Sequence, residues 1–219
     1  MNKIWIRSFI MIIGVGFALV LGGCISVSNS PTPRFYVLQA GYENQVNKKI
    51  GATSDFVIGI GPVKIPEYQD RAKIVTRGKD QMLKFSEFDR WGESLSLGVT
   101  RLIRENLTAM FPRAKFILYP WNSAIEAKYQ VVVEVIQLDS DLQKELFLIA
   151  QWQVIDVQNT KIMIIKRSEF RQPIIPQNYS GLAKTLSTVC ASLSREIAES
   201  IVTIEKKEND SASQEASQE

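Results

Sequence analysis

Hydrophobic residues recur along this chain with two different spacings, and each spacing predicts one kind of secondary structure. Short apolar runs and strict alternation favour strands, whereas recurrence every three or four residues favours helices. In the first half of the chain the short runs predict strands at 34–39 and 56–60 and a hairpin built from 73–77 and 81–85. The residues between the last two strands, Gly-Lys-Asp, provide a turn.

Two segments carry the helical spacing, and each is apolar on one face only. The first stripe runs along 95–110 and contains Leu95, Val99, Leu102, Ile103, Leu107 and Met110. The second begins near Tyr179 and contains Leu182, Leu186, Val189, Leu193, Ile197 and Ile201. Because the opposite faces are polar, each helix needs a sheet or another partner to cover its stripe.

The second half of the chain is rich in strand-forming residues. Apolar runs and alternation predict strands at 115–119, 129–138, 146–154 and 161–170. The last three are separated by short polar turns, which favours an antiparallel meander. We therefore expect an α/β or α+β fold: one domain with a mixed, mostly antiparallel sheet and two amphipathic helices packed on it.

The two ends of the chain follow neither spacing. Residues 1–23 place two basic side chains before an apolar run that is shorter than the roughly 20 residues of a membrane-spanning helix, so they predict a signal peptide. Residues 24–33 are small and polar and predict a tether. Residues 205–219 lack hydrophobic side chains and predict a disordered tail. The folded domain is expected to span 34–204.

Cys24 changes the prediction from a secreted to an anchored protein. The sequence Leu-Gly-Gly-Cys at 21–24 resembles a bacterial lipobox, which implies acyl chains on Cys24 after cleavage before it. Each buried methylene contributes roughly 0.8 kcal/mol, so several chains hold a protein on a membrane. Ile25 stands where inner-membrane lipoproteins carry Asp, which implies transport to the outer membrane. The alternative is an ordinary signal peptide that leaves Cys24 free.

Composition and charge narrow the function classes. The chain has no histidine, which removes Ser–His and Cys–His nucleophile pairs and the commonest metal ligand. Its formal charge is +3, and two of the basic residues belong to the leader, so we expect no nucleic-acid partner. Cys190 lies among apolar helix positions and is predicted to be a small buried hydrophobe. Gly59 and Gly61 lack the third glycine of a dinucleotide site, so we expect no cofactor and no metal.

A resemblance to a known family is carried by GPVKIPEYQDRAKIVTR, residues 61–77. The sequences at 33–38, 90–95 and 193–198 extend it over nearly the whole domain. These segments resemble the PqiC/YmbA-type lipoproteins, also called ABC-type transport auxiliary lipoproteins. The chain departs from the family pattern at Gln69, where the family has Leu, and at Ala72 and Ser94, where it has Pro.

The resemblance implies a non-enzymatic lipoprotein on the periplasmic face of the outer membrane. It would be the docking subunit of an MCE-domain protein that bridges the envelope and moves lipids between membranes, in support of envelope integrity. The resemblance also implies a homo-oligomer, for example a ring. It supplies no catalytic residue. The candidate partner surface consists of matched residues: Pro66, Tyr68, Asp70, Arg71, Arg77 and Trp91.

Three other readings of the residues stay open. The sheet and helices could enclose an apolar cavity, as in a lipid-binding shuttle. Paired carboxylates could serve an envelope hydrolase. The basic residues Arg71, Lys73, Arg77 and Lys79 could contact anionic head groups, or they could form a solvated face paired with neighbouring acids.

Overall fold

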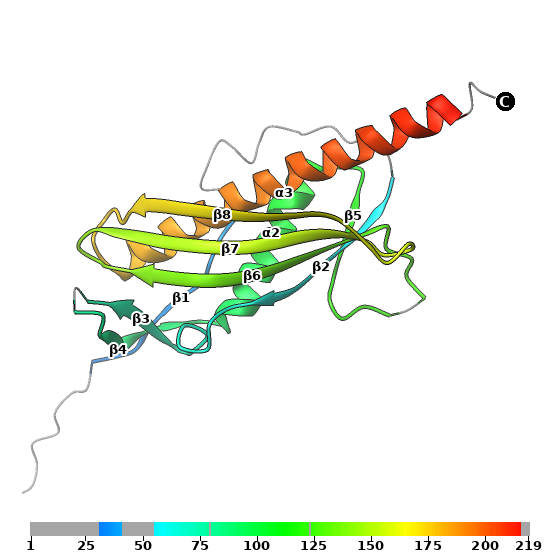
Figure 1. Ribbon diagram of the computed structural model, residues 1–219. Helices are drawn as coiled ribbons and strands as arrows, with labels where there is room; N and C mark the ends of the chain where they lie inside the picture. The colour runs from blue at the N-terminus through cyan, green and yellow to red at the C-terminus, as the bar shows by residue number, and fades with distance from the viewer. Residues whose placement is uncertain (1–30, 41–54, 79, 123, 216–219) are drawn as a thin grey trace, which may run out of the picture. The chain divides into compact units, whose positions relative to one another are not determined.

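The structure of the protein is a computed structural model, and it describes residues 31–40, 55–78, 80–122 and 124–215 (Figure 1). The predicted signal peptide, the lipidation site at Cys24, most of the tether and Lys79 lie outside the described residues. Along the described part of the chain the elements are β1 (Arg34–Tyr36), β2 (Val57–Lys64), β3 (Lys73–Arg77), β4 (Leu83–Trp91), α2 (Leu95–Met110), β5 (Lys115–Leu118), β6 (Tyr129–Ser140), β7 (Glu145–Asp156), β8 (Lys161–Pro173) and α3 (Tyr179–Glu215).

The larger sheet has five strands in the order β5-β2-β6-β7-β8. The last three form the predicted antiparallel meander, with β6 paired to β7 and β7 to β8. β2 lies between β5 and β6 and is parallel to both. Ile58 and Ile60 are two positions apart and so point to the same face of β2, where both are fully buried.

The smaller sheet has three strands in the order β1-β4-β3. β3 and β4 form the predicted hairpin, and β4 continues beyond Phe85 to Trp91, where its last three residues pair in parallel with β1. The predicted fold class is confirmed as α+β, with the strands divided between two sheets rather than gathered in one. The division arises because residues 65–72 turn the chain away from the larger sheet before β3 begins.

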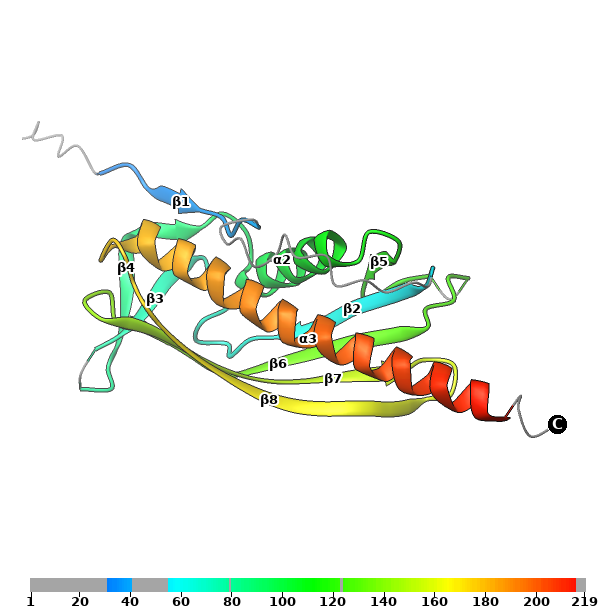
Figure 2. The same cartoon turned by 90° about the horizontal axis from the view of Figure 1, so that it is seen from above.

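Both helices lie on one face of the five-stranded sheet, where they also contact each other (Figure 2). Every member of the predicted stripe on α2 is buried, and so is every member of the stripe on α3. Together with the inward residues of β2, β6 and β7 they form one continuous apolar core. The periodicity of the sequence therefore predicted the helix faces correctly.

α3 extends to Glu215, beyond the predicted end of the domain at 204. At 37 residues it is about 55 Å long. The disordered tail predicted for 205–219 is corrected over residues 205–215, which are helical. Glu205 is buried, and Glu208 accepts a hydrogen bond of 2.7 Å from the Tyr129 hydroxyl and pairs with Lys128 at 2.9 Å. None of the helices in the described ranges is long and apolar enough to cross a membrane.

Candidate functional site

Residues 65–72, which we call the joint, connect the two sheets and contain four of the six predicted partner-surface residues. The amides of Gln69 and Asp70 both donate to the carbonyl of Pro66, at 2.8 and 3.1 Å, and close a tight turn. The side chain of Gln69 is buried and donates to the carbonyl of Leu138 on β6 at 2.7 Å. The joint is therefore attached to the larger sheet by a directional bond.

Asp70 attaches the joint to the start of α2. Its carboxylate accepts hydrogen bonds from the Ser94 hydroxyl at 3.0 Å and from the Ser96 amide at 3.1 Å. Ser94, at the N-cap position, forms no side-chain cap of its own, so Asp70 satisfies a free amide of the helix terminus. Burial acts to raise the pKa of Asp70, but the hydrogen bonds from Ser96 and Ser94 together hold that pKa below its ordinary value.

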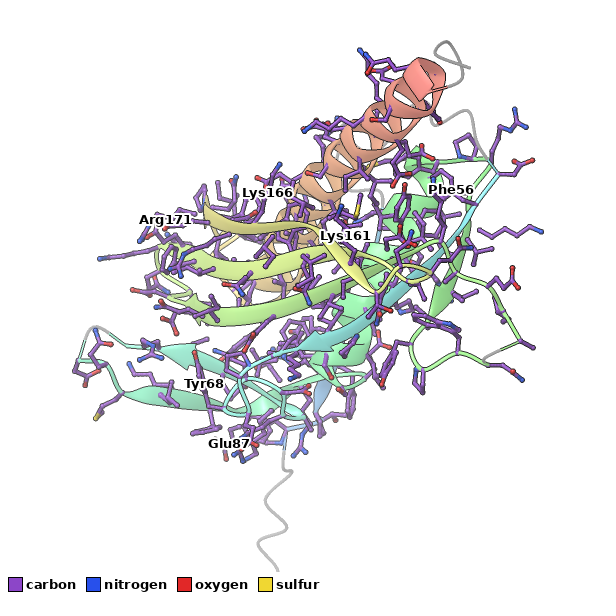
Figure 3. All side chains as sticks on the ribbon, turned by 45° about the vertical axis from the view of Figure 1, so that its right-hand side comes forward. Phe56, Tyr68, Glu87, Lys161, Lys166 and Arg171 are labelled. Carbon is purple, nitrogen blue, oxygen red and sulfur yellow. The ribbon has the colours of Figure 1, made fainter. Side chains whose placement is uncertain are left out.

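Arg77, the last residue of the stretch 61–77, makes a further attachment to the larger sheet. Its Nε donates to the Asp139 carboxylate on β6 at 2.7 Å, and this bond raises the pKa of the guanidinium. The same guanidinium lies 5.6 Å from the centroid of the Tyr68 ring. Tyr68 is half-buried, at the side of the molecule formed by the small sheet (Figure 3). The ring is thus held in place while one edge stays accessible.

The other predicted residues divide into exposed and buried ones. Arg71 is exposed, and its Nε reaches only the Glu67 carbonyl, at 3.2 Å. Pro66 is half-buried. Trp91 is 6% exposed, so it belongs to the core beneath the joint, where its amide donates to the carbonyl of Ala72. Of the predicted residues in the joint, Arg71 is therefore exposed and Tyr68 and Pro66 are partly accessible, beside the exposed acid Glu67.

A second polar cluster, which the sequence did not predict, holds β1 on β4. The buried Asp89 carboxylate receives two hydrogen bonds from Arg34, at 2.8 and 2.9 Å, one from the Tyr36 hydroxyl at 2.8 Å and one from the Ser86 hydroxyl at 3.0 Å. Burial acts to raise the pKa of Asp89, and these donors hold it below its ordinary value. The sequence could have indicated this cluster through the position of Asp89, because an acid that points inward from a strand needs hydrogen-bond or charge partners.

The far end of the molecule, around the last turns of α3, carries a groove of about 610 Å³. Its walls mix lysines and acids with apolar side chains, among them Lys128, Asp156, Lys161, Met163, Ile204 and Glu208. Burial raises the pKa of the neighbouring Glu205, although Lys128 acts in the opposite direction. Lys161 marks this groove beside α3 in Figure 3.

The acidic and sulfur-containing side chains of the described residues are relevant to metal and nucleophile chemistry. Within the described ranges no three His, Cys, Asp or Glu side chains lie close enough together to hold a metal ion. Cys190 is fully buried, and burial raises the pKa of its thiol to about 12. At neutral pH this thiol is therefore protonated and unreactive.

Comparison with known proteins agrees with the resemblance seen in the sequence. The family model described as ABC-type transport auxiliary lipoprotein component matches residues 36–198. An uncharacterized protein of known structure aligns with a TM-score of 0.63 at 16% identity, over 78% of this chain and 99% of that one. Protein XCC0632 from Xanthomonas campestris, of the DUF330 family, aligns with a TM-score of 0.61 at 8% identity, over 82% and 99%. No curated protein sequence matches the chain.

Proposed function

The chain belongs to the family of ABC-type transport auxiliary lipoproteins, and from this membership we propose that it is a non-enzymatic docking subunit of an MCE-type lipid transport system. Acyl chains on Cys24 would hold it on the outer membrane, facing the periplasm. In that place it would receive the end of an envelope-bridging MCE-domain protein. Lipid transfer through that assembly would support envelope integrity.

The observation that carries this proposal is the construction of the joint. The side chains of Gln69 and Arg77 form hydrogen bonds to β6, and that of Asp70 accepts one from α2. Those bonds fix the backbone that carries Tyr68 and Arg71, so the joint itself would lose little conformational freedom when a partner binds. Tyrosine and arginine are also the residue types that most often dominate binding energy at protein interfaces.

Self-association is proposed for a different surface, the uncovered face of the five-stranded sheet. Ile136, Ile162 and Ile165 are exposed there, on strands β6 and β8. β8 is also the edge strand of that sheet, so one side of its backbone is free to pair with another strand. A head-to-tail contact between such a face and a different face of a second copy would close into a ring.

Two alternative functions fit the structure less well. A lipid shuttle needs a cavity between helices and sheet, but this space is filled by side chains of the core, such as Leu102, Val131 and Ile197. A carboxylate hydrolase needs acids that are free to act. The buried acids Asp89 and Asp156 each already accept several hydrogen bonds from other protein groups.

The experiment that tests the docking role compares two charge reversals in cells. Arg71→Glu changes the joint, and Lys206→Glu makes the same change at an exposed position of α3. We expect the first variant to recover at least tenfold less MCE-domain protein in a pull-down from membrane extracts, and the second to match the wild type. Equal recovery by both variants would remove the joint from the proposal.

Anchoring is tested separately by intact mass and membrane fractionation of the wild type beside Cys24→Ala. We expect the wild type to start at an acylated Cys24 and to sediment with outer membranes, and the variant to leave that fraction. A soluble, unmodified wild-type protein would contradict the anchored subunit.

A further inference from the structure

Three loops meet at the end of the domain opposite the far-end groove, and we call this the entry end. It consists of the β3–β4 tip (residues 78 and 80–82), the β6–β7 turn (141–144) and the β8–α3 loop (174–178). The Ile174 amide donates to the Lys144 carbonyl at 3.1 Å, and the Gln177 side chain donates to the Gln143 carbonyl at 2.8 Å. A hollow of about 480 Å³ is lined by the β3–β4 tip and the β6–β7 turn together. The three loops therefore form one continuous surface, at the left of Figures 1 and 2.

This surface presents large apolar side chains to solvent. Met82 is 60% exposed, Ile175 is 70% exposed, and Phe85, at the start of β4, is 50% exposed. Single exposed apolar residues are ordinary, but several on the loops of one end indicate a binding surface. None of the three belongs to the apolar core, whereas Ile174, next to Ile175, is buried in it.

The charged side chains of the entry end favour binding to a surface that carries phosphate groups. Lys84 and Lys144 are exposed, and neither makes an ion pair within the described part of the chain. The acids nearby are used in the turns themselves: Asp80 accepts from the Met82 amide and Asp141 from the Gln143 amide. Apolar side chains flanked by free lysines are typical of a segment that rests in the head-group layer of a bilayer.

β1 runs parallel to the last three residues of β4, and its first residue is the one nearer to the entry end. β1 is parallel to β4, with Arg34 opposite Asp89 and Tyr36 opposite Trp91. Pro33, which precedes Arg34, therefore lies on the side of Arg34 that faces the start of β4, and β4 starts at the β3–β4 tip. Ten residue steps separate Cys24 from Arg34, so their reach is at most about 33 Å whatever path they take.

We propose that the entry end rests on the lipid bilayer that holds the anchor, with Met82, Phe85 and Ile175 in the head-group region and Lys84 and Lys144 on lipid phosphates. This inference rests on the proposed acylation of Cys24. It adds an orientation: the far-end groove, along an α3 of about 55 Å, points away from the membrane toward the periplasm. In this proposal the acyl anchor supplies the affinity for the membrane, and the contacts of the entry end set the orientation of the domain on it.

The test uses the full acylated protein in phosphatidylethanolamine–phosphatidylglycerol vesicles that contain brominated lipid. Single cysteines at Met82→Cys, Ile175→Cys and, as the control on the last turns of α3, Ser211→Cys carry an environment-sensitive fluorophore. The native thiol of Cys190 is buried and does not compete for the label. We expect at least a twofold quenching by brominated lipid at positions 82 and 175, and none at 211.

The outcomes separate this inference from the proposed function. If the protein floats with the vesicles but positions 82 and 175 are not quenched, the orientation is overturned while the anchoring stands. Protection of those positions from aqueous iodide without quenching by brominated lipid overturns it in favour of a protein partner. If the wild-type protein does not float with the vesicles, the anchoring fails, and the inference fails with it.

Discussion

The two sheets of the domain are held in different ways. The five-stranded sheet and its helices are held by apolar burial, in a core to which β2, β6, β7, α2 and α3 all contribute. The three-stranded sheet contributes only a few side chains to that core, including Ile74 and Trp91. It is otherwise attached by polar bonds, from Gln69 and Arg77 to β6 and from Asp70 to α2.

Because of this difference, the stability of the domain and the position of its small sheet depend on different interactions. Apolar burial supplies most of the free energy of folding but has no direction. Buried hydrogen bonds contribute less net energy, yet they define one geometry. The larger sheet therefore determines whether the domain folds, and the polar bonds determine where the small sheet and the joint stand on it.

The largest effect is expected from the core of the larger sheet. Leu102→Ala removes a fully buried side chain on α2 and should lower the free energy of unfolding by about 3 kcal/mol. Leu97→Ala is the control, because Leu97 lies on the same helix but is 64% exposed, and we expect a change below about 0.5 kcal/mol. Urea unfolding measures both. A similar loss in the two variants would mean that α2 is not packed as described.

A smaller effect is expected at the attachment of β1. Asp89→Asn should cost about 2 kcal/mol, because it weakens four hydrogen bonds to a buried carboxylate. Asp55→Asn is the matched control, since Asp55 and its partner Arg113 are 71% and 61% exposed and such pairs contribute little. Hydrogen exchange should show faster opening of β1 and β4 in the first variant and unchanged β6 and β7. Equally faster hydrogen exchange in both sheets would contradict the conclusion that the two sheets are held by different interactions.

The sequence predicted the larger sheet and its helices well because apolar periodicity is a local signal. Each buried position on α2 follows from the spacing of residues within 95–110, and the meander follows from short turns between alternating runs. No partner far along the chain was needed to infer either. The same local signal gave the hairpin of β3 and β4, but not the continuation of β4 to Trp91.

The attachments could not be predicted because their partners are distant in sequence. Asp70 caps a helix that begins 25 residues later, and Asp89 binds Arg34, 55 residues away. Composition also failed at 205–215, where Tyr129 and Lys128 hold a polar segment in the helix through Glu208. Residue types identify a capping acid or a buried charge, but only the fold supplies its partner.

Removing the cap on α2 should lower the free energy of unfolding less than the Leu102→Ala and Asp89→Asn changes do. Asp70→Ala leaves the Ser96 amide without its acceptor and should cost about 1 kcal/mol. Ser94→Ala is expected to cost only a few tenths, because the Ser94 side chain caps no amide of the helix. Thermal unfolding at neutral pH compares the two variants. A larger loss from Ser94→Ala would assign the cap to the N-cap residue instead.

Lowering the pH should weaken the hydrogen bonds of Asp70 and Asp89, which attach the small sheet and its joint. The pKa values of Asp70 and Asp89 are lower in the folded protein than in the unfolded chain, where an aspartate has a pKa of about 3.9. Their contribution to stability is therefore complete above about pH 4 and is lost as the pH falls through the folded values. We expect the Asp89→Asn variant to show a shallower loss of stability below about pH 4 than the wild type. An identical slope in both would contradict this assignment.

The far end should respond to acid with the opposite sign, and with the smallest effect. Burial raises the pKa of Glu205 in the folded protein; of its charged neighbours, Lys128 lowers this pKa and Glu208 raises it. The charged form therefore costs stability at neutral pH, and this cost disappears as the pH falls through the folded value. Glu205→Gln should stabilise the protein by about 0.5 kcal/mol at pH 7 and leave it unchanged in acid, where Glu205 is already neutral.

The matched control for Glu205→Gln is Glu199→Gln, at an exposed position of the same helix, which should change nothing at either pH. Unfolding measured from pH 7 to pH 4 then separates two roles for Glu205. A gain that vanishes in acid identifies the cost of burying its charge. A loss at every pH would mean that the carboxylate accepts a bond the fold requires, and the far end would then resemble the polar attachments of the small sheet rather than the apolar core.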